Sequence, residues 1–183
     1  MSNQIISVVK QCPTAIAADA LPYRFYLTEN GDGTGVTNHN IDYSETPTTI
    51  YFEAQYLFEL HNLLINITCA SKTYQDKYGD ITNGLSNGIK FYIRPVGSLV
   101  DIPLLYNAGV KKNYEWLEVT HDVEITQWEG NPQTISINLC LVDCFGTSLS
   151  ISPGGIFKII LNDDFHTLLN HSFRIAGKYY VNT

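Results

Sequence analysis

The sequence predicts an all-β protein: an antiparallel β-sandwich of about eight strands, jelly-roll-like, with an extended N-terminal arm. Three observations lead to this prediction. Short apolar segments with alternating patterning recur between turn-forming residues. β-branched and aromatic residues dominate these segments, and no segment has a clear amphipathic helical pattern. The chain has 183 residues, of which 44% are hydrophobic, and this suits one domain with a substantial core.

Two parts are expected along the chain: an arm over residues 1–22 and a sandwich domain over residues 23–183. The arm mixes short apolar groups with Ala and Pro and shows no periodicity. A strand over residues 23–28 follows it. The next segment, GDGTG at 31–35, is predicted to be a turn, because glycine adopts positive φ without steric cost. Asp32 lacks the regularly spaced acids of a calcium loop, so a plain turn is favoured.

The stretch Tyr51–Ser71 is predicted to hold the central strand, around which the rest of the chain packs. Its apolar residues change parity, from even positions at 58 and 60 to odd positions from 63 to 69. Because successive side chains of a strand point to opposite faces, one extra residue accounts for the change. We therefore predict a long, bent strand with a β-bulge near His61–Asn62. The β-branched content argues against the alternative, a buried helix.

Turn-forming residues separate the remaining predicted strands. Asn-Gly pairs lie at 83–84 and 87–88, and turns are expected at 128–132 and 152–155. Residues 165–170 are expected to be a loop or one helical turn. In the segment 116–127, Leu117, Val119, Val123 and Ile125 are expected to face inward. The remaining predicted strands cover residues 48–53, 89–94, 116–127, 134–142, 156–161 and 173–181.

The charge distribution argues against several partner classes. The net charge is −7, and residues 113–164 contain eight acids against one base, Lys158. Nucleic acid is therefore not expected as the main partner, because phosphate neutralisation needs clustered Lys and Arg. No apolar run reaches the ~20 residues of a membrane span. The N-terminus lacks a signal-peptide pattern, so we expect synthesis in a cytoplasm and no membrane partner.

Motifs for catalysis or metal binding are not found in the sequence. It lacks HExxH, a phosphate-binding glycine loop and GxSxG. Its four cysteines, Cys12, Cys69, Cys140 and Cys144, are expected to be small buried residues, since a reducing compartment disfavours disulfides and their spacing gives no zinc motif. We predict no catalytic, cofactor-binding or metal-binding residue.

Four polar residues near the C-terminus are the strongest candidates for chemistry: Asp163, Asp164, His166 and His171. Carboxylates beside histidines can bind a metal or transfer protons. However, Asn-Asp-Asp after an apolar strand is also ordinary turn chemistry, and this is the interpretation we favour.

Tyrosine is abundant, with 12 residues, and this fits either a carbohydrate-binding module or a protein interface. Composition leaves both interpretations open. Tyrosines in predicted loops are Tyr43, Tyr74, Tyr78 and Tyr106.

Six segments between Gly31 and the C-terminus carry a resemblance through their order. They are GDGTG at 31–35, DYSETPTTIYFEA at 42–54, LFELHNLLINI at 57–67, YGDITNGLSNGIKFYI at 78–93, LVDIPLLYNAGVKKNYEWLEVTHDVEITQW at 99–128 and FKIILNDDFHTLLNHSFRIAGKYY at 157–180. As an ordered set they resemble a family of small accessory structural proteins of tailed bacteriophages. Residues 1–22 lie outside the resemblance.

The resemblance implies a non-enzymatic virion component, made in the infected bacterium and built into the particle. The leading expectation is a capsid-associated decoration or cement protein. Its partners would be other virion proteins (the major capsid protein, or tail and neck proteins) and further copies of itself. Alternatives are a tail, neck or fibre-attachment component, or a glycan- or receptor-binding module. We expect the arm to lie across a neighbouring subunit, so that its ordering entropy is lost only on binding.

Overall fold

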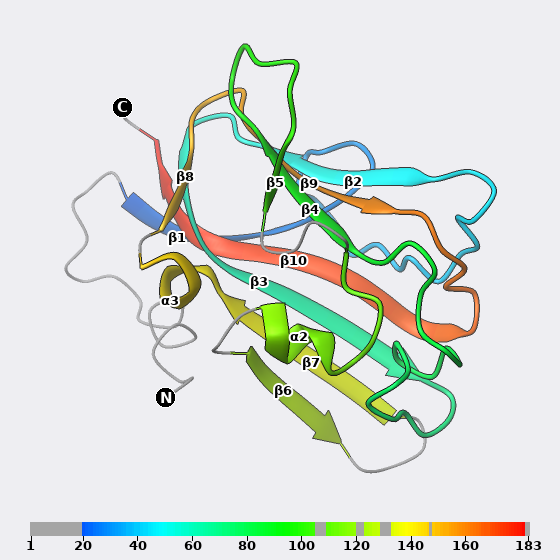
Figure 1. Cartoon of the computed structure of the whole chain (residues 1–183). Helices are drawn as coiled ribbons and strands as arrows, with labels where there is room; N and C mark the ends of the chain where they lie inside the picture. The colour runs from blue at the N-terminus through cyan, green and yellow to red at the C-terminus, as the bar shows by residue number, and fades with distance from the viewer. Residues whose placement is uncertain (1–19, 105–108, 120–122, 129–132, 147, 182–183) are drawn as a thin grey trace.

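Two antiparallel β-sheets pack face to face as a sandwich, and the described residues also form two short helices (Figure 1). The computed structural model describes residues 20–104, 109–119, 123–128, 133–146 and 148–181. The predicted fold class is confirmed. Residues 1–19 of the predicted arm lie outside the described residues. Its last three residues, 20–22, pair with the C-terminal strand instead, because the first strand begins at Ala20.

The larger sheet, sheet A, is built around the two longest strands, β3 and β10. A sixth strand, β8 (Leu149–Ile151), pairs with residues 58–60 of β3, next to the stretch 62–69 that pairs with β7. In order across sheet A, the other strands are β1 (Ala20–Tyr26), β10 (Leu168–Tyr180), β3 (Leu57–Cys69), β7 (Gln133–Cys140) and β6 (Val123–Trp128).

The smaller sheet, sheet B, takes strands that alternate along the chain with those of sheet A. The chain passes from sheet A to sheet B and back over β1, β2 and β3, and does so again over β8, β9 and β10. Late strands thus lie between early ones in both sheets, as in the two Greek keys of a jelly roll. In order across sheet B, the strands are β2 (Thr48–Glu53), β9 (Ile156–Leu161), β4 (Lys90–Arg94) and β5 (Ile102–Leu104).

The predicted bulge lies in β3 at His61. Asn62 is opposite Ala176, whereas Leu60 is opposite Gly177, so His61 is the extra residue. Burial follows the parity change, because positions 58, 60, 63, 65, 67 and 69 are all fully buried. The bulge therefore keeps both halves of the strand facing the core.

Gly177 allows the two central strands to approach each other beside the bulge. A Cβ atom at this position would overlap the carbonyl oxygen of Glu59. Glycine is therefore required here by the closeness of the neighbouring backbone rather than by an unusual φ.

The predicted strand over 116–127 is wrong in its first half, which forms helix α2 (Glu115–Val119) before β6. The Glu115 carboxylate accepts hydrogen bonds from the backbone N–H groups of Lys111 and Lys112, and so fixes the turn into the helix. Trp116 is fully buried, whereas Leu117, expected to face inward, is 53% exposed. Consecutive residues of a helix point in different directions, so only one of the two reaches the core.

Other boundaries also differ from the prediction. Helix α3 (Leu141–Phe145) replaces the end of the strand expected over 134–142, and the Cys140 side chain caps it by accepting from the Asp143 N–H. β10 begins at Leu168, within the segment expected to be a loop or helical turn. With β5 and β8, which the sequence analysis missed, the described residues contain ten strands rather than eight.

The core between the sheets joins aliphatic side chains of β3 to aromatic side chains from both sheets. Phe25 stacks on Phe52 with ring centroids 4.4 Å apart, and Phe58 meets Phe52 edge-on at 5.4 Å. Cys69 and Cys140 are buried as predicted. In the part of the chain that the structure describes, no helix is long and apolar enough to cross a membrane.

Replacing Ile65 with Ala should lower the free energy of unfolding by about 2–5 kcal/mol, because the side chain is fully buried and leaves a cavity. Leu64→Ala, on the half-buried outer face of the same strand, is the matched control and should cost clearly less. Urea denaturation followed by circular dichroism measures both. Equal losses for the two variants would contradict the assigned faces of β3.

Candidate functional site

The four candidate residues identified in the sequence do not converge on one site. Asp163 and His171 are buried, with 5% and 0% of their surface exposed, whereas Asp164 and His166 are on the surface. Inside the protein, Asp163 and His171 both lie near Tyr78. His171 is hydrogen-bonded to the Tyr78 hydroxyl. Burial raises the pKa of Tyr78, and the charge of Asp163 raises it further. The arrangement therefore consists of one buried cluster and one exposed pair.

Asp163 ties the 86–88 turn to the end of β9. Its carboxylate accepts backbone N–H bonds from Ser86 at 2.7 Å, Asn87 at 3.0 Å and Gly88 at 2.9 Å. The Asn87 side chain also donates to the Asn162 carbonyl. Several N–H donors directed at one carboxylate satisfy a buried charge. This supports the structural role that the sequence analysis favoured for Asp163.

Asp164 and His166 form an exposed pair. The Asp164 carboxylate accepts from the His166 backbone N–H at 3.0 Å and contacts the ring Nδ1. These hydrogen bonds raise the pKa of His166. The backbones of Asp164 and Asp42 also form a β-bridge, which holds the chain at Asp42 against the segment between β9 and β10.

His171 belongs to a buried polar cluster with Tyr78 and His39. The Tyr78 hydroxyl and His171 Nε2 are 3.0 Å apart, and the His39 backbone N–H donates to the His171 carbonyl at 2.7 Å. His171 Nδ1 and both ring nitrogens of His39 have no partner among the described residues. Burial, together with the neighbouring His39, lowers the pKa of His171 to about 3, so this imidazole is neutral in the folded protein.

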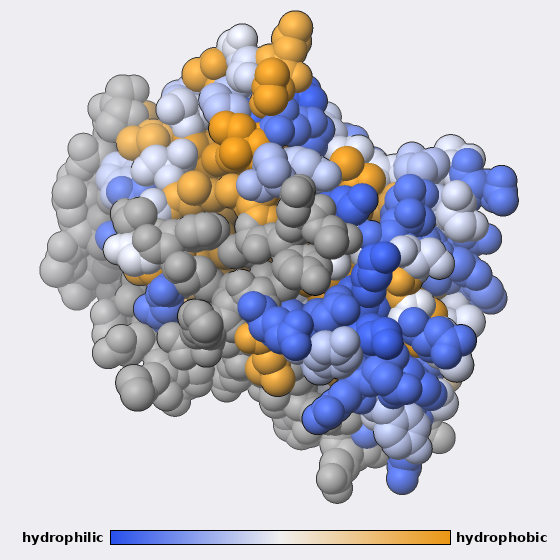
Figure 2. Space-filling view, viewed as in Figure 1, coloured by the Kyte–Doolittle hydropathy of each residue, from blue (hydrophilic) through white to orange (hydrophobic). Residues whose placement is uncertain are grey.

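The feature best placed for contact with another molecule is the β4–β5 hairpin. Its apolar residues are unusually exposed: 94% for Leu99, 67% for Val100, 58% for Val96 and 47% for Ile102. Figure 2 shows apolar side chains projecting at the top of the molecule, where Figure 1 places this hairpin. We call these four residues the apolar hairpin. Contiguous exposed apolar side chains of this kind mark interaction sites.

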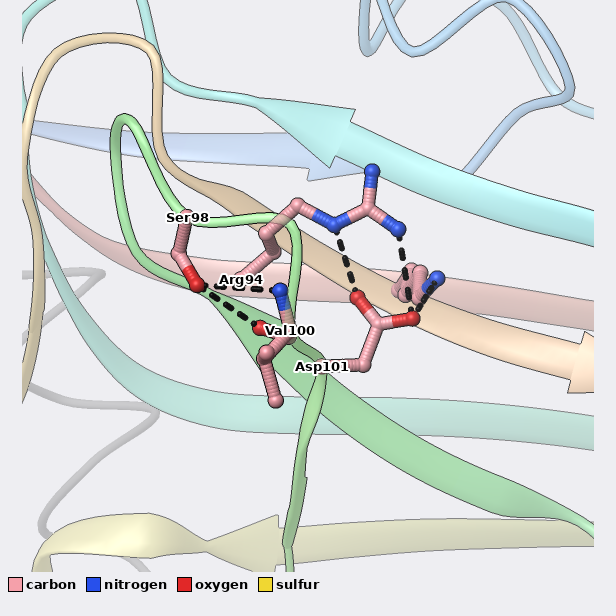
Figure 3. Close-up of polar contacts among 5 residues, drawn as sticks. Arg94, Ser98, Val100 and Asp101 are labelled. Atoms are coloured by element: carbon pink, nitrogen blue, oxygen red, sulfur yellow. Dashed lines mark hydrogen bonds and ion pairs between the residues drawn. The ribbon is translucent and has the colours of Figure 1, made fainter.

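An ion-pair network braces the base of the apolar hairpin (Figure 3). Arg94 donates two parallel hydrogen bonds to the Asp101 carboxylate, from Nε at 2.8 Å and from Nη2 at 3.2 Å. Lys158, from neighbouring β9, contacts the same carboxylate. Burial alone would raise the pKa of Asp101, but hydrogen bonds from Arg94 and Lys158 outweigh it and lower this pKa. Planar two-point pairing holds the hairpin in one orientation.

The turn of the hairpin is also ordered. The Ser98 N–H donates to the Pro95 carbonyl at 3.1 Å, and Gly97 has a φ of 72°. The Ser98 hydroxyl accepts from the Val100 N–H at 3.0 Å. The hairpin thus presents its apolar residues on a fixed backbone.

The sequence analysis missed the apolar hairpin, because it predicted no strand between residues 94 and 116. The signal was present: Val96, Leu99 and Val100 flank the turn-forming residues Gly97 and Ser98, where polar residues are usual. Periodicity could not detect it, because the strands on either side are short.

The tyrosines of the predicted loops differ in exposure. Tyr43 and Tyr78 are buried, Tyr74 is 58% exposed, and Tyr106 lies outside the described residues. A separate group lies at the β1–β10 end of sheet A. There, Tyr179 meets Tyr23 edge-on at 5.5 Å and Tyr56 at 5.4 Å, and both partners are about two-fifths exposed.

No known family model and no curated protein matches this chain. Across the described residues, no group of three or more His, Cys, Asp or Glu side chains is arranged to hold a metal ion.

Lowering the pH from about 6.5 towards 3 should reduce the free energy of unfolding. The unfolded chain binds a proton on His171 in this range and the folded protein does not, so stability falls by up to about 1.4 kcal/mol per pH unit from this group. His171→Gln should flatten the slope measured by urea denaturation between pH 7 and pH 5. His166→Gln is the control and should not flatten it, because Asp164 raises the pKa of His166 in the folded state.

Asp163→Asn should lower the free energy of unfolding by about 1–3 kcal/mol, because an amide cannot accept all the N–H bonds that the carboxylate accepts. Amide hydrogen exchange at residues 86–88 should accelerate. Asp164→Asn, exposed and one residue away, should change stability by less than about 0.5 kcal/mol. Unchanged exchange at 86–88 in the Asp163 variant would contradict the tethering role.

Proposed function

We propose that this protein is a non-enzymatic structural component of a bacteriophage virion, a decoration or cement protein that attaches to the capsid through the apolar hairpin. The observation that carries the proposal is the exposure of four apolar side chains on a hairpin braced by Arg94, Asp101 and Lys158. The resemblance of the ordered segments to accessory phage proteins supports attachment to a virus particle, which contains many copies of one lattice protein.

The energetics of the hairpin suit attachment to a repeated surface. Burying one Leu or Val side chain contributes about 1.5–3 kcal/mol, and the fixed backbone limits the entropy lost on docking. A site of this size gives modest affinity for a single contact. Many contacts on one lattice, or contacts among neighbouring copies, raise the total by avidity.

A tail, neck or fibre-attachment role uses the same surface and differs in the location of the protein on the particle. A glycan- or receptor-binding module is the second candidate, and the exposed pair Tyr23 and Tyr56 around Tyr179 favours it. Aromatic faces of this kind stack on sugar rings. Cryo-electron microscopy of purified particles separates these roles, because decoration places copies over the head lattice and attachment places a few at the neck or tail.

Leu99→Asp should reduce incorporation into particles at least tenfold, because a carboxylate at the tip cannot be buried in an apolar contact. The variant should melt within about 1 °C of the wild type, since Leu99 is almost fully exposed. Incorporation is measured by quantitative mass spectrometry of particles assembled with the variant protein.

Leu169→Asp is the matched control, because Leu169 is 50% exposed and lies in β10, outside the hairpin. It should be incorporated as the wild type is. Equal incorporation of the two variants would refute attachment through the hairpin. Absence of the wild-type protein from particles would refute the virion role itself.

A further inference from the structure

The outer face of sheet A contains a cationic site that the proposed attachment through sheet B does not use. In a chain of net charge −7, the adjacent strands β1, β10 and β3 contain the cations Arg24, Arg174 and Lys178 and only one acid, Glu59. Glu59 lies directly opposite Lys178 in the β3–β10 pair, so this acid offsets the lysine and leaves the two arginines. This corner of the sheet is thus positive although the whole molecule is acidic.

Arg24 and Arg174 lie side by side on this face. Arg24 is opposite Ala176 and Tyr26 is opposite Arg174, so the two arginines are diagonal neighbours, at the separation of about 7–8 Å typical of such pairs. Both point away from the core, because Phe25, Phe173 and Ile175 fill the inner face of the same strands. Their proximity contributes, after burial, to a lowered pKa for Arg24.

Neither guanidinium has a hydrogen bond or carboxylate partner among the described residues. Arg174 lies over the Tyr26 ring, 5.9 Å from its centroid, and its buried Nε has no acceptor. Arg24 is exposed. By contrast, Arg94, the third arginine of the chain, is fully engaged by Asp101. Two neighbouring unpaired guanidiniums repel each other, and a shared anion removes the repulsion.

The surroundings of the arginine pair favour a small polyhydroxylated anion over a macromolecule. Half-buried neutral side chains continue across the face of the sheet in two pairs, Ser136 with Asn66 at 3.1 Å and Thr68 with Thr134 at 3.2 Å. Such amides and hydroxyls match sugar hydroxyls. Two or three cations are too few for a nucleic-acid backbone, which is held through many phosphate contacts.

We propose that Arg24 and Arg174 form a binding site for the carboxylate of an acidic sugar, whose hydroxyls contact the neighbouring polar rows of sheet A. Each guanidinium offers paired N–H donors that match the two oxygens of a carboxylate. The site is independent of the apolar hairpin, which belongs to sheet B.

Isothermal titration of the full chain with 3′-sialyllactose and with a galacturonic acid trisaccharide tests the site, and lactose is the neutral control. At least one acidic sugar should bind, the binding should weaken between 50 and 300 mM salt, and lactose should bind at least tenfold more weakly. No binding of either acidic sugar at millimolar concentration, or equal binding of lactose, would overturn the proposal.

The variants Arg24→Gln and Arg174→Gln should each raise the dissociation constant at least tenfold. Arg174→Lys should recover only part of the affinity, because an ammonium lacks the planar pair of donors. Lys90→Gln, in sheet B, removes the same charge elsewhere and should change the constant less than twofold. Since Arg24 is exposed, its variant should fold normally, and unaltered binding by it would overturn the proposal. Particle incorporation should stay unchanged in the arginine variants, so failure here leaves the hairpin proposal standing.

Discussion

The pairing of β3 with β10 is the constraint on which the rest of the structure depends. Each strand has 13 residues, and the two are paired over almost their whole length. β1 is attached to one side of the pair, and β7 and β8 share the other. β10 also fixes the chain beyond β1, because its carbonyls at Phe173 and His171 accept from the backbone N–H groups of Leu27 and His39. The buried cluster around His171 is positioned by the same strand.

The two proposed surfaces use this rigid body in different ways. The apolar hairpin extends from sheet B and depends on a local ion-pair network at its base. The arginine pair lies on the outer face of sheet A and depends on the register between β1 and β10. Because the sheets pack face to face, one surface can be occupied without blocking the other. Only 16% of the residues are charged, so both surfaces differ from the mostly neutral surface around them.

The sequence was informative where one physical rule dominated. Short apolar, β-prone segments predicted β2 and β9 to the residue, and the parity change predicted the bulge near His61–Asn62, where the structure has it at His61. The strand prediction was wrong at 115–119, where the Glu115 carboxylate and the burial of Trp116 favour a helix. Neither surface was predicted, since each depends on which residues the fold leaves unpaired. Arg24 and Arg174 are 150 positions apart, and only their register makes them neighbours.

The position of β10 between β1 and β3 has a consequence for the order of folding. β10 begins 142 residues after the end of β1 and 99 residues after the end of β3, yet these two strands are joined within the sheet only through β10. Sheet A thus closes through long-range contacts, which are slow to form. Gly177 then limits how it closes, since a slip of one residue would place Ala176 or Lys178 against the Glu59 carbonyl. A one-residue slip of the strand that closes the sheet is thus sterically opposed, which disfavours misregistered, aggregation-prone forms of the nascent protein.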